Sequence, residues 1–304
     1  MGTDWRETVR ASLQTSRVTL DAPLRQATTL RIGGAADCLV ELESEAELPI
    51  LFALSARAGV PLNVLGRGSN LLVRDEGVRG IVVRLGRAFQ QVRCDSEQAT
   101  AQGGAALPNA MFVERCREQG LGGMEFLVAV PGSLGGAIAM NAGAHGDDTA
   151  SHLVSVRVFD RVLNAVLEKP VSEIEFSYRH SPLRGQEGRV ILSGIFSLRK
   201  LSDEAIQTRK QEIQSYRRET QPRDFPNCGS VFKNPPGNFA ARLIEESGLK
   251  GHRIGDAQVS EKHANFIVNR GQATSADVMA LIDLIQETVY ERTGIRLDLE
   301  VQIF

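Results

Sequence analysis

Hydrophobic positions recur at helical spacing near the end of the chain, in the stretch "SADVMALIDLIQETVYERTG". The apolar side chains that share one face of this predicted helix are Val278, Leu281, Ile282, Ile285 and Val289. Thr274 and Asp277, just at its start, can cap the helix. The pattern therefore predicts an amphipathic helix with a defined N-terminus.

The last ten residues, "IRLDLEVQIF", alternate with a period of two instead. One face of the predicted strand is polar and includes Glu300, with Arg296, Asp298 and Gln302. The other face is apolar and comprises Ile295, Leu297, Leu299, Val301 and Ile303. On this pattern alone, Glu300 is a solvated carboxylate on a strand.

Similar patterns predict further helices and strands. Helices are predicted over about 45–58, 107–120, 202–222 and 238–247, and strands over 79–85, 154–160 and 188–200. Ser44 and Glu47 can form a capping box for the first of these helices, and Gly59 ends it. Because strands and helices mix without strict alternation, the order favours α+β domains over one doubly wound sheet.

Length and charge restrict the classes of protein that fit. The chain has 304 residues, which suggests two or three domains. Its 35 basic and 37 acidic residues give a net charge of −2, so nothing favours binding to nucleic acid or to an anionic membrane. The N-terminus is charged and lacks the apolar core of a secretory signal, and no apolar run approaches the roughly 20 residues of a membrane span.

The four cysteines, at positions 38, 94, 116 and 228, include no C-x-x-C pair and no zinc-ligand spacing. We therefore expect reduced thiols in a cytoplasmic protein and no metal site.

Glycine clusters in two loops, "LGRGSNLLV" (65–73) and "PGSLGGAIAMNAGAHG" (131–146). The first loop lies between two predicted strands, and Leu71 occupies the third glycine position of a dinucleotide fingerprint, which excludes that motif. Backbone N–H groups in such loops approach anions closely, so two loops suit an extended ligand with a pyrophosphate, such as FAD. Two tight turns without a ligand are an equally good interpretation at this point.

The stretch "FPNCGSVFKNP" (225–235) carries two candidate reactive side chains, Cys228 and Ser230. A serine hydrolase with Ser230, or a thiol enzyme with Cys228 and His252 or His263, would each need a histidine base. The chain lacks the G-x-S-x-G motif of a nucleophile elbow, which disfavours the hydrolase.

Six motifs occur in one order, and together they resemble the UDP-N-acetylenolpyruvoylglucosamine reductase family of flavoenzymes. They are "TTLRIGGAAD" (28–37), "LGRGSNLLV", "VPGSLGGAIAMNAGAHG", "SYRHS" (177–181), "GSVFKNP" (229–235) and "GLKGHRIGDAQVSEKHANFIVN" (248–269). The resemblance implies NADPH-dependent, FAD-mediated reduction of UDP-N-acetylglucosamine enolpyruvate to UDP-N-acetylmuramate in peptidoglycan synthesis. Another non-covalent FAD oxidoreductase of the same fold is the alternative.

The resemblance also implies an architecture. We expect an α+β protein with a two-subdomain FAD-binding fold of the vanillyl-alcohol-oxidase/p-cresol-methylhydroxylase (PCMH) type and a C-terminal α+β substrate domain. The expected segments are an N-terminal lead-in (1–27), FAD-binding subdomains 1 (28–75) and 2 (76–200), and a UDP-sugar domain (201–304) that begins with a linking helix (201–222). No histidine precedes His145, so covalent FAD attachment at the first glycine loop is excluded and FAD should bind non-covalently.

Three catalytic residues follow from the resemblance. Arg179, within "SYRHS", matches the arginine that stabilises the growing negative charge on the substrate carboxylate, a task that suits a guanidinium fork. Glu300 would hydrogen-bond the same carboxylate in its protonated form. Ser230 matches the proton donor. Without the motif, Arg179 is one of 35 basic residues with nothing to single it out.

The remaining expected site residues bind cofactor or substrate. The expected cofactor contacts are Gly66, Arg67, Gly68, Ser69, Asn70, Leu71, Pro131, Gly132, Ser133, Gly135, Gly136, Asn141, Ala142 and Gly143. The expected substrate contacts are Tyr178, Lys233, Asn234, Lys250 and Asn265. The chain ends four residues after Glu300 and so resembles the short form of the family. We expect a monomer whose partners are a UDP-sugar and NADPH, with no nucleic acid and no membrane.

Overall fold

The computed structural model describes residues 4–184 and 188–304. Residues 1–3 of the expected lead-in and 185–187 of expected subdomain 2 lie outside the described residues. Contacts group the chain into two units built from segments that interleave along the sequence. Unit 1 comprises Met1–Asp21, Asp37–Gly66 and Arg79–Ser215, and unit 2 comprises Ala22–Ala36, Arg67–Val78 and Tyr216–Phe304. The expected segment boundaries concern binding domains, which this grouping does not define, and they stay a prediction.

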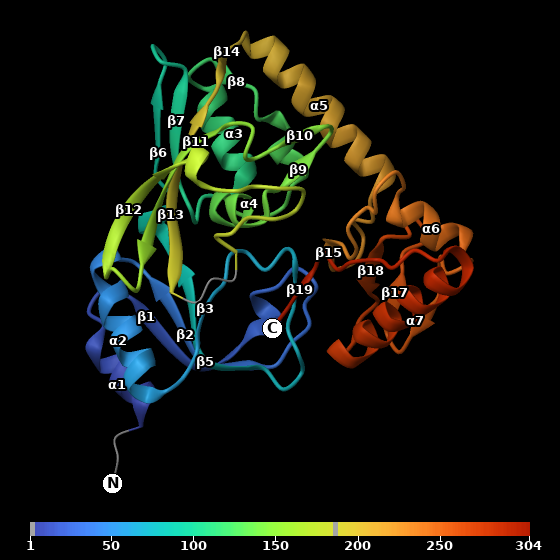
Figure 1. The fold of residues 1–304 in the computed structure, drawn as a ribbon, viewed down its shortest axis with the longest axis horizontal. Helices are drawn as coiled ribbons and strands as arrows, with labels where there is room; N and C mark the ends of the chain where they lie inside the picture. Colours follow the sequence, from blue (N-terminus) through green and yellow to red (C-terminus); the bar gives the residue numbers. More distant parts are fainter. Residues whose placement is uncertain (1–3, 185–187) are drawn as a thin grey trace. The chain divides into compact units, whose positions relative to one another are not determined.

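A five-stranded antiparallel sheet organises much of unit 1. Its strands lie in the order β12 (Ala165–Pro170), β11 (Leu153–Asp160), β13 (Arg189–Ser197), β7 (Thr100–Gly104) and β6 (Val92–Asp95). The helices α3 (Asn109–Arg117) and α4 (Leu134–Met140) pack beside it (Figure 1). Phe112 of α3 and Phe196 of β13 are fully buried in the core that they share.

A second sheet has the order β1 (Arg17–Pro23), β2 (Ala35–Leu42), β5 (Val78–Leu85) and β3 (Leu62–Val64), with β3 parallel to β5. The helices α1 (Trp5–Ser12) and α2 (Leu48–Ala58) lie beside one another and bury apolar residues with this sheet (Figure 1).

The predicted capping box at the start of α2 is wrong. Ser44 accepts a hydrogen bond from the N–H of Ala46 and caps a 3₁₀ turn, η2 (Glu45–Glu47), that precedes the helix. The Glu47 carboxylate instead accepts from the N–H groups of Gln14 at 2.7 Å and Thr15 at 2.8 Å. The Glu47 carboxylate is therefore bound to a distant segment and makes no capping bond at the local helix end. Gly59 ends α2 in the left-handed conformation, as predicted.

Unit 2 contains a four-stranded sheet and two helices (Figure 1). The strand order is β15 (Asn227–Ser230), β18 (Phe266–Asn269), β17 (Ala257–Val259) and β16 (Arg253–Ile254). The helices are α6 (Ala240–Glu246) and α7 (Ser275–Thr293). Both predictions for α7 are confirmed: Thr274 and Asp277 form a capping box, and all five residues of the predicted apolar face are buried.

The C-terminal segment confirms the predicted faces but not the predicted strand. Leu297 and Val301 are buried, and Ile295, Leu299 and Ile303 pack against the same core. Only β19 (Gln302–Ile303) is a strand, and it pairs in parallel with β4 (Leu71–Leu72). The segment changes partners along its length, because the N–H groups of Glu300 and Val301 both bond the carbonyl of Val231. This change interrupts a regular ladder.

The charged helix predicted over 202–222 is α5 (Asp203–Thr220). The other short elements are η1 (Leu24–Gln26), η3 (Arg87–Phe89), β8 (Leu121–Gly122), η4 (Glu125–Ala129), β9 (Gly143–Ala144), β10 (Asp147–Asp148), η5 (Val171–Glu173) and β14 (Arg199–Lys200). In the described part of the chain, no helix combines the length and the apolar character that a membrane span requires.

Candidate active site

The segment that carries Ser230 lies beside the segment that carries Glu300, both in unit 2. The N–H of Glu300 donates to the carbonyl of Val231 at 2.8 Å, and the N–H of Lys233 donates to the carbonyl of Asp298 at 2.8 Å. Ser230 and Glu300 are both half-buried. These backbone bonds bring two residues that are far apart in the sequence into one neighbourhood.

The first glycine loop joins this neighbourhood through Asn70. The side-chain Nδ2 of Asn70 donates to the carbonyl of Glu300 at 3.0 Å, and the Asn70 carbonyl accepts from the N–H of Gln302 at 3.0 Å. Asn70 therefore fixes the loop against the chain end that carries Glu300.

Thr29 makes the corresponding link on the Ser230 side. Its hydroxyl donates to the carbonyl of Asn227 in β15 at 2.7 Å, and its N–H donates to the carbonyl of Gly68 at 3.0 Å. Gly68 has φ of 62°, and a Cβ there would lie 2.2 Å from the carbonyl oxygen of Ala27. Only glycine fits this close approach.

The Ser230 hydroxyl itself has no hydrogen-bond partner among residues 4–184 and 188–304. A half-buried hydroxyl without an internal partner is available to a bound substrate, whereas a hydroxyl committed to the backbone is not. This state is compatible with a proton donor.

Cys228 does not compete with Ser230 for a chemical role. Its side chain is buried, and burial raises the pKa of the thiol to about 12. A thiol with this pKa carries almost no thiolate at neutral pH, so it is a poor nucleophile. The structure thus opposes the thiol-enzyme interpretation of this stretch.

Two expected substrate contacts hold the Ser230–Asn234 segment in place. The side chain of Asn265 is buried and bonds Phe232 twice, accepting from its N–H at 2.9 Å and donating to its carbonyl at 2.8 Å. The side chain of Asn234 accepts from the N–H of Ala240 at 3.0 Å, at the start of α6. Their expected substrate contacts stay predictions, but both side chains already have a positioning task.

The other expected substrate contacts are Lys250, Lys233 and Tyr178. Lys250 pairs with Glu245 at 2.9 Å, so an incoming diphosphate would have to displace that carboxylate. Lys233 is half-buried, directly after Phe232. Tyr178, in unit 1, is 52% exposed and stacks against the guanidinium of Arg179.

In unit 1, parts of the two glycine loops converge on Ser133. Ideal Cβ atoms on Gly66 and Gly136 would lie 3.5 Å and 3.7 Å from the Ser133 Oγ. Apart from the chain neighbours and the backbone of α4, no other heavy atom of the described chain lies within 4 Å of either position, so larger side chains would fill open space here. Gly66 of the first loop and Gly136 of α4 thus leave open space beside the Ser133 hydroxyl, which fits a pyrophosphate group.

Asn109 anchors the second loop, a role that was not predicted from the sequence. Its N–H donates to the carbonyl of Gly132 at 3.2 Å, and its buried side chain donates to the carbonyl of Val130 at 2.9 Å. Asn109 belongs to a predicted helix, and no sequence signal marked it as a loop anchor.

Arg179 occupies a strained position in a tight turn. Ser177 and His180 exchange two backbone hydrogen bonds across the turn, at 3.1 Å and 3.0 Å. Arg179 is its third residue and has φ of 54°. Glycine or asparagine is usual at a positive-φ turn position, because other side chains cost roughly 1–2 kcal/mol there. The Arg179 Nη2 donates to the carbonyl of Gly143 at 2.7 Å, which links this turn to the second glycine loop.

The structure therefore groups the expected site residues in two sets. Ser230, Glu300 and Asn70 come together within unit 2. Arg179 and the second glycine loop come together within unit 1.

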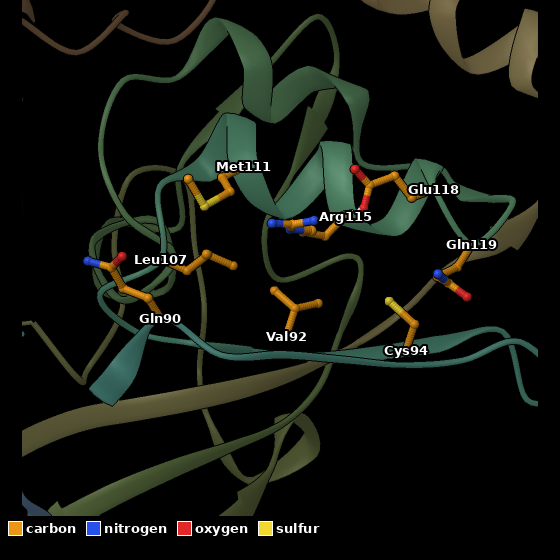
Figure 2. Close-up of a pocket in the computed structure, with 8 residues that line it drawn as sticks. All are labelled: Gln90, Val92, Cys94, Leu107, Met111, Arg115, Glu118 and Gln119. Atoms are coloured by element: carbon orange, nitrogen blue, oxygen red, sulfur yellow. Dashed lines mark hydrogen bonds and ion pairs between the residues drawn. The ribbon is translucent and has the colours of Figure 1, made fainter. Parts of the chain in front are cut away.

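A separate cavity of about 420 Å³ lies between β6 and α3 in unit 1 (Figure 2). Figure 2 shows Met111, Arg115 and Glu118 on the helix above it and Val92 and Cys94 on the strand below. Its lining in the described chain contains none of the expected site residues. Among residues 4–184 and 188–304, no group of three or more His, Cys, Asp or Glu side chains is placed to hold a metal ion.

Comparisons with known proteins define the class first. The family model described as FAD binding domain matches residues 36–162, so the chain is a flavoprotein with FAD as its cofactor. This domain and the C-terminal match confirm the predicted fold class, an α+β protein with a PCMH-type FAD-binding fold and a further C-terminal domain. That C-terminal model is described as UDP-N-acetylenolpyruvoylglucosamine reductase, C-terminal domain, and matches residues 221–304.

Whole-chain relatives then identify the family. The chain is 44% identical to UDP-N-acetylenolpyruvoylglucosamine reductase 2 of Symbiobacterium thermophilum over 290 residues. These aligned residues cover 95% of this chain and 92% of the relative. It is 47% identical over 283 residues to the reductase of Heliobacterium modesticaldum, over 92% and 88% of the two chains. The crystal structure of the reductase from Thermus caldophilus superimposes with a TM-score of 0.81 at 36% identity, over 96% of this chain and 100% of that one. The chain belongs to the UDP-N-acetylenolpyruvoylglucosamine reductase family of enzymes.

Proposed function

We propose that the protein reduces UDP-N-acetylglucosamine enolpyruvate to UDP-N-acetylmuramate with NADPH, a step of peptidoglycan precursor synthesis. The names of the relatives support this substrate. The observation that carries the proposal is in unit 2, where hydrogen bonds join the Ser230 segment, the Glu300 segment and Asn70 of the first glycine loop. A cofactor loop, a proton donor and a second carboxylate ligand thereby share one neighbourhood.

FAD, when bound, supplies the redox chemistry by passing hydride from NADPH to the terminal alkene carbon of the substrate. Gly66, Ser133 and Gly136 would hold its pyrophosphate in unit 1, since they leave open space beside a hydroxyl. Arg67 and Gly68 of the first loop, and Pro131 and Gly132 of the second, would complete the cofactor contacts.

The chain's own residues act on the substrate carboxylate and on one proton. Negative charge grows on the carboxylate during the reaction, and the guanidinium of Arg179 stabilises it by charge-assisted hydrogen bonds. Glu300 in its protonated form donates a further hydrogen bond to the same group. Ser230 gives its hydroxyl proton to the carbon beside the carboxylate, which completes addition across the double bond. Lys233 binds the diphosphate.

The substitution Ser230→Ala tests the proton donor. Flavin reduction by NADPH should remain at the wild-type rate, because no proton from Ser230 is needed there. Flavin reoxidation by the UDP-sugar should slow by about 10²–10⁴-fold, the usual contribution of a positioned acid. Both half-reactions are measured by anaerobic stopped-flow absorbance.

Cys228→Ala is the matched control, since Cys228 lies two residues away in the same strand and is buried. It should keep both half-reactions. A Ser230→Ala variant that reoxidises at the wild-type rate would remove Ser230 from the mechanism.

The expected monomeric state and cytoplasmic location also stay predictions, as does non-covalent attachment of FAD.

A further inference from the structure

The side chain of Asn141 is committed at both ends to the protein. Its Nδ2 donates to the carbonyl of Ser177 at 3.1 Å and lies 3.4 Å from Oδ2 of Asp148, and its Oδ1 accepts from the N–H of Ala150 at 2.9 Å. The side chain is buried. The sequence predicted a cofactor contact here, but the amide has little capacity left for a ligand.

Asn141 lies between the cofactor loop and the turn that carries Arg179. It ends α4 in the left-handed conformation, with φ of 42°. Its bond to Ser177 holds the first residue of the turn in which Arg179 is the third. Gly143, two residues after Asn141, accepts directly from Arg179. One short segment therefore holds the turn at its start and at the guanidinium.

The hairpin that follows Asn141 makes this support rigid. Its ladder pairs Gly143 with Asp148 and Ala144 with Asp147. Thr149 adds two bonds to the carbonyl of Ala142, from its N–H at 3.0 Å and from its hydroxyl at 2.7 Å. The side chain of Asn141 extends this ladder by its bond to Ala150. The carbonyl of Gly143 is thus presented to Arg179 from a fixed backbone.

We propose that Asn141 is a positioning residue for Arg179, which it holds in the strained turn by its two-ended bond between Ser177 and Ala150. This inference rests on the proposed role of Arg179 in the reaction. Asn141 acts through the turn and the Gly143 carbonyl and contacts neither substrate nor reacting atoms.

Asn141→Asp tests the two hydrogen bonds of the Asn141 side chain, to Ser177 and from Ala150, with almost no change in side-chain size. The aspartate keeps the acceptor for Ala150, but as a carboxylate it loses the donor to Ser177 and faces the carboxylate of Asp148. Protonation of the new carboxyl restores a donor to Ser177, so flavin reoxidation by the variant should recover at low pH. The titratable and charged groups near this position are His145, Asp147, Asp148 and His152 of the hairpin and the segment after it, Tyr178, Arg179 and His180 of the turn, and Glu125 of η4, which packs against the hairpin.

The expected result is a split between the two half-reactions. At pH 8, flavin reoxidation by the UDP-sugar should be slower than in the wild type by up to about 100-fold, the scale of a small misplacement of a catalytic group. FAD content and flavin reduction by NADPH should match the wild type. The ratio of variant to wild-type reoxidation rate should rise as pH falls.

Asn141→Gly is the companion variant, because glycine suits the left-handed conformation and removes both side-chain hydrogen bonds. It should slow reoxidation at every pH, without recovery at low pH. It also tests the proposal if the aspartate variant does not fold. Asn164→Asp is the matched control: Asn164 has φ of 49° and is exposed at the tip of the β11–β12 hairpin, so its variant should behave as wild type.

Two outcomes overturn the inference. Loss of FAD from both Asn141 variants would make Asn141 a cofactor contact, and wild-type reoxidation in both would leave it without a role in positioning Arg179. Neither outcome touches the proposed function, which fails only if the wild-type protein does not turn over the UDP-sugar.

Discussion

Arg179 occupies a turn position where glycine or asparagine is usual. This conformation indicates a functional position independently of the sequence motif. Arg179 has φ of 54°, a conformation that destabilises the folded state for a side chain of this kind. Such strain is commonly kept at functional sites, where the surrounding structure fixes it. Here the two turn bonds and the bond to Gly143 do so.

The substitution Arg179→Asn should separate function from folding. Asparagine tolerates the positive φ, so the thermal unfolding midpoint should stay within a few degrees of the wild type. The guanidinium is lost, so reoxidation of the flavin by substrate should fall by about 10²–10³-fold, as when a donor to developing charge is removed. Calorimetry and stopped-flow absorbance measure the two effects. Unimpaired reoxidation would show that the strain at Arg179 has no catalytic purpose.

Local patterns in the sequence were sufficient to predict elements with their own periodicity and caps. The helix α7, its capping box and its buried face are examples. Contacts between distant segments were not predictable in the same way. Glu47 caps nothing locally because Gln14 and Thr15 take its carboxylate, and Asp75 accepts from the N–H of Ser275 at the start of α7. The sequence offers no signal for partners so far away.

The C-terminal segment shows the same limit. Its alternation correctly predicted which side chains are buried, because burial depends on period. It did not reveal that the backbone changes partners at Val231, which depends on tertiary pairing. The motif match predicted Ser230, Glu300 and Asn70 as site residues, and the structure added that Asn70, Thr29 and Asn109 hold the loops in place.

At the scale of elements, an ion-pair cluster joins α5 to α3 in unit 1. Glu114 of α3 binds Arg117 on its own helix and Lys210 of α5, and Arg117 also binds Asp203. Hydrogen bonds from Arg117, and then from Lys210, lower the pKa of the Glu114 carboxyl from 4.5 to about 2. Because the folded-state pKa is depressed, this stabilisation is present above about pH 4.5 and is lost as pH falls toward 2.

The variant Glu114→Gln should therefore lower stability at neutral pH and reduce the loss of stability between pH 4.5 and pH 2. Denaturant unfolding at a series of pH values measures this. Glu118→Gln is the control, since the Arg115–Glu118 pair is an exposed i,i+3 pair and should contribute little. A Glu114→Gln variant with the wild-type pH dependence would contradict the assignment.

At the scale of the whole molecule, the two units interleave along the chain, which a consecutive division of the sequence does not anticipate. Residues 67–78 belong with the C-terminal part, so the first glycine loop crosses from one unit to the other at Gly66–Arg67. Hydrophobic and polar patterns have no means of showing this, because they report on local structure. The ordered motifs did give the family, since a family match uses the whole chain at once.

We propose that this flavoprotein reduces UDP-N-acetylglucosamine enolpyruvate. The most direct test is one anaerobic turnover of the wild-type protein, in which its flavin is first reduced with one equivalent of NADPH and then mixed with the UDP-sugar. We expect rapid return of the oxidised-flavin absorbance and formation of UDP-N-acetylmuramate, measured by mass spectrometry. A flavin that stays reduced in the presence of the UDP-sugar would contradict it.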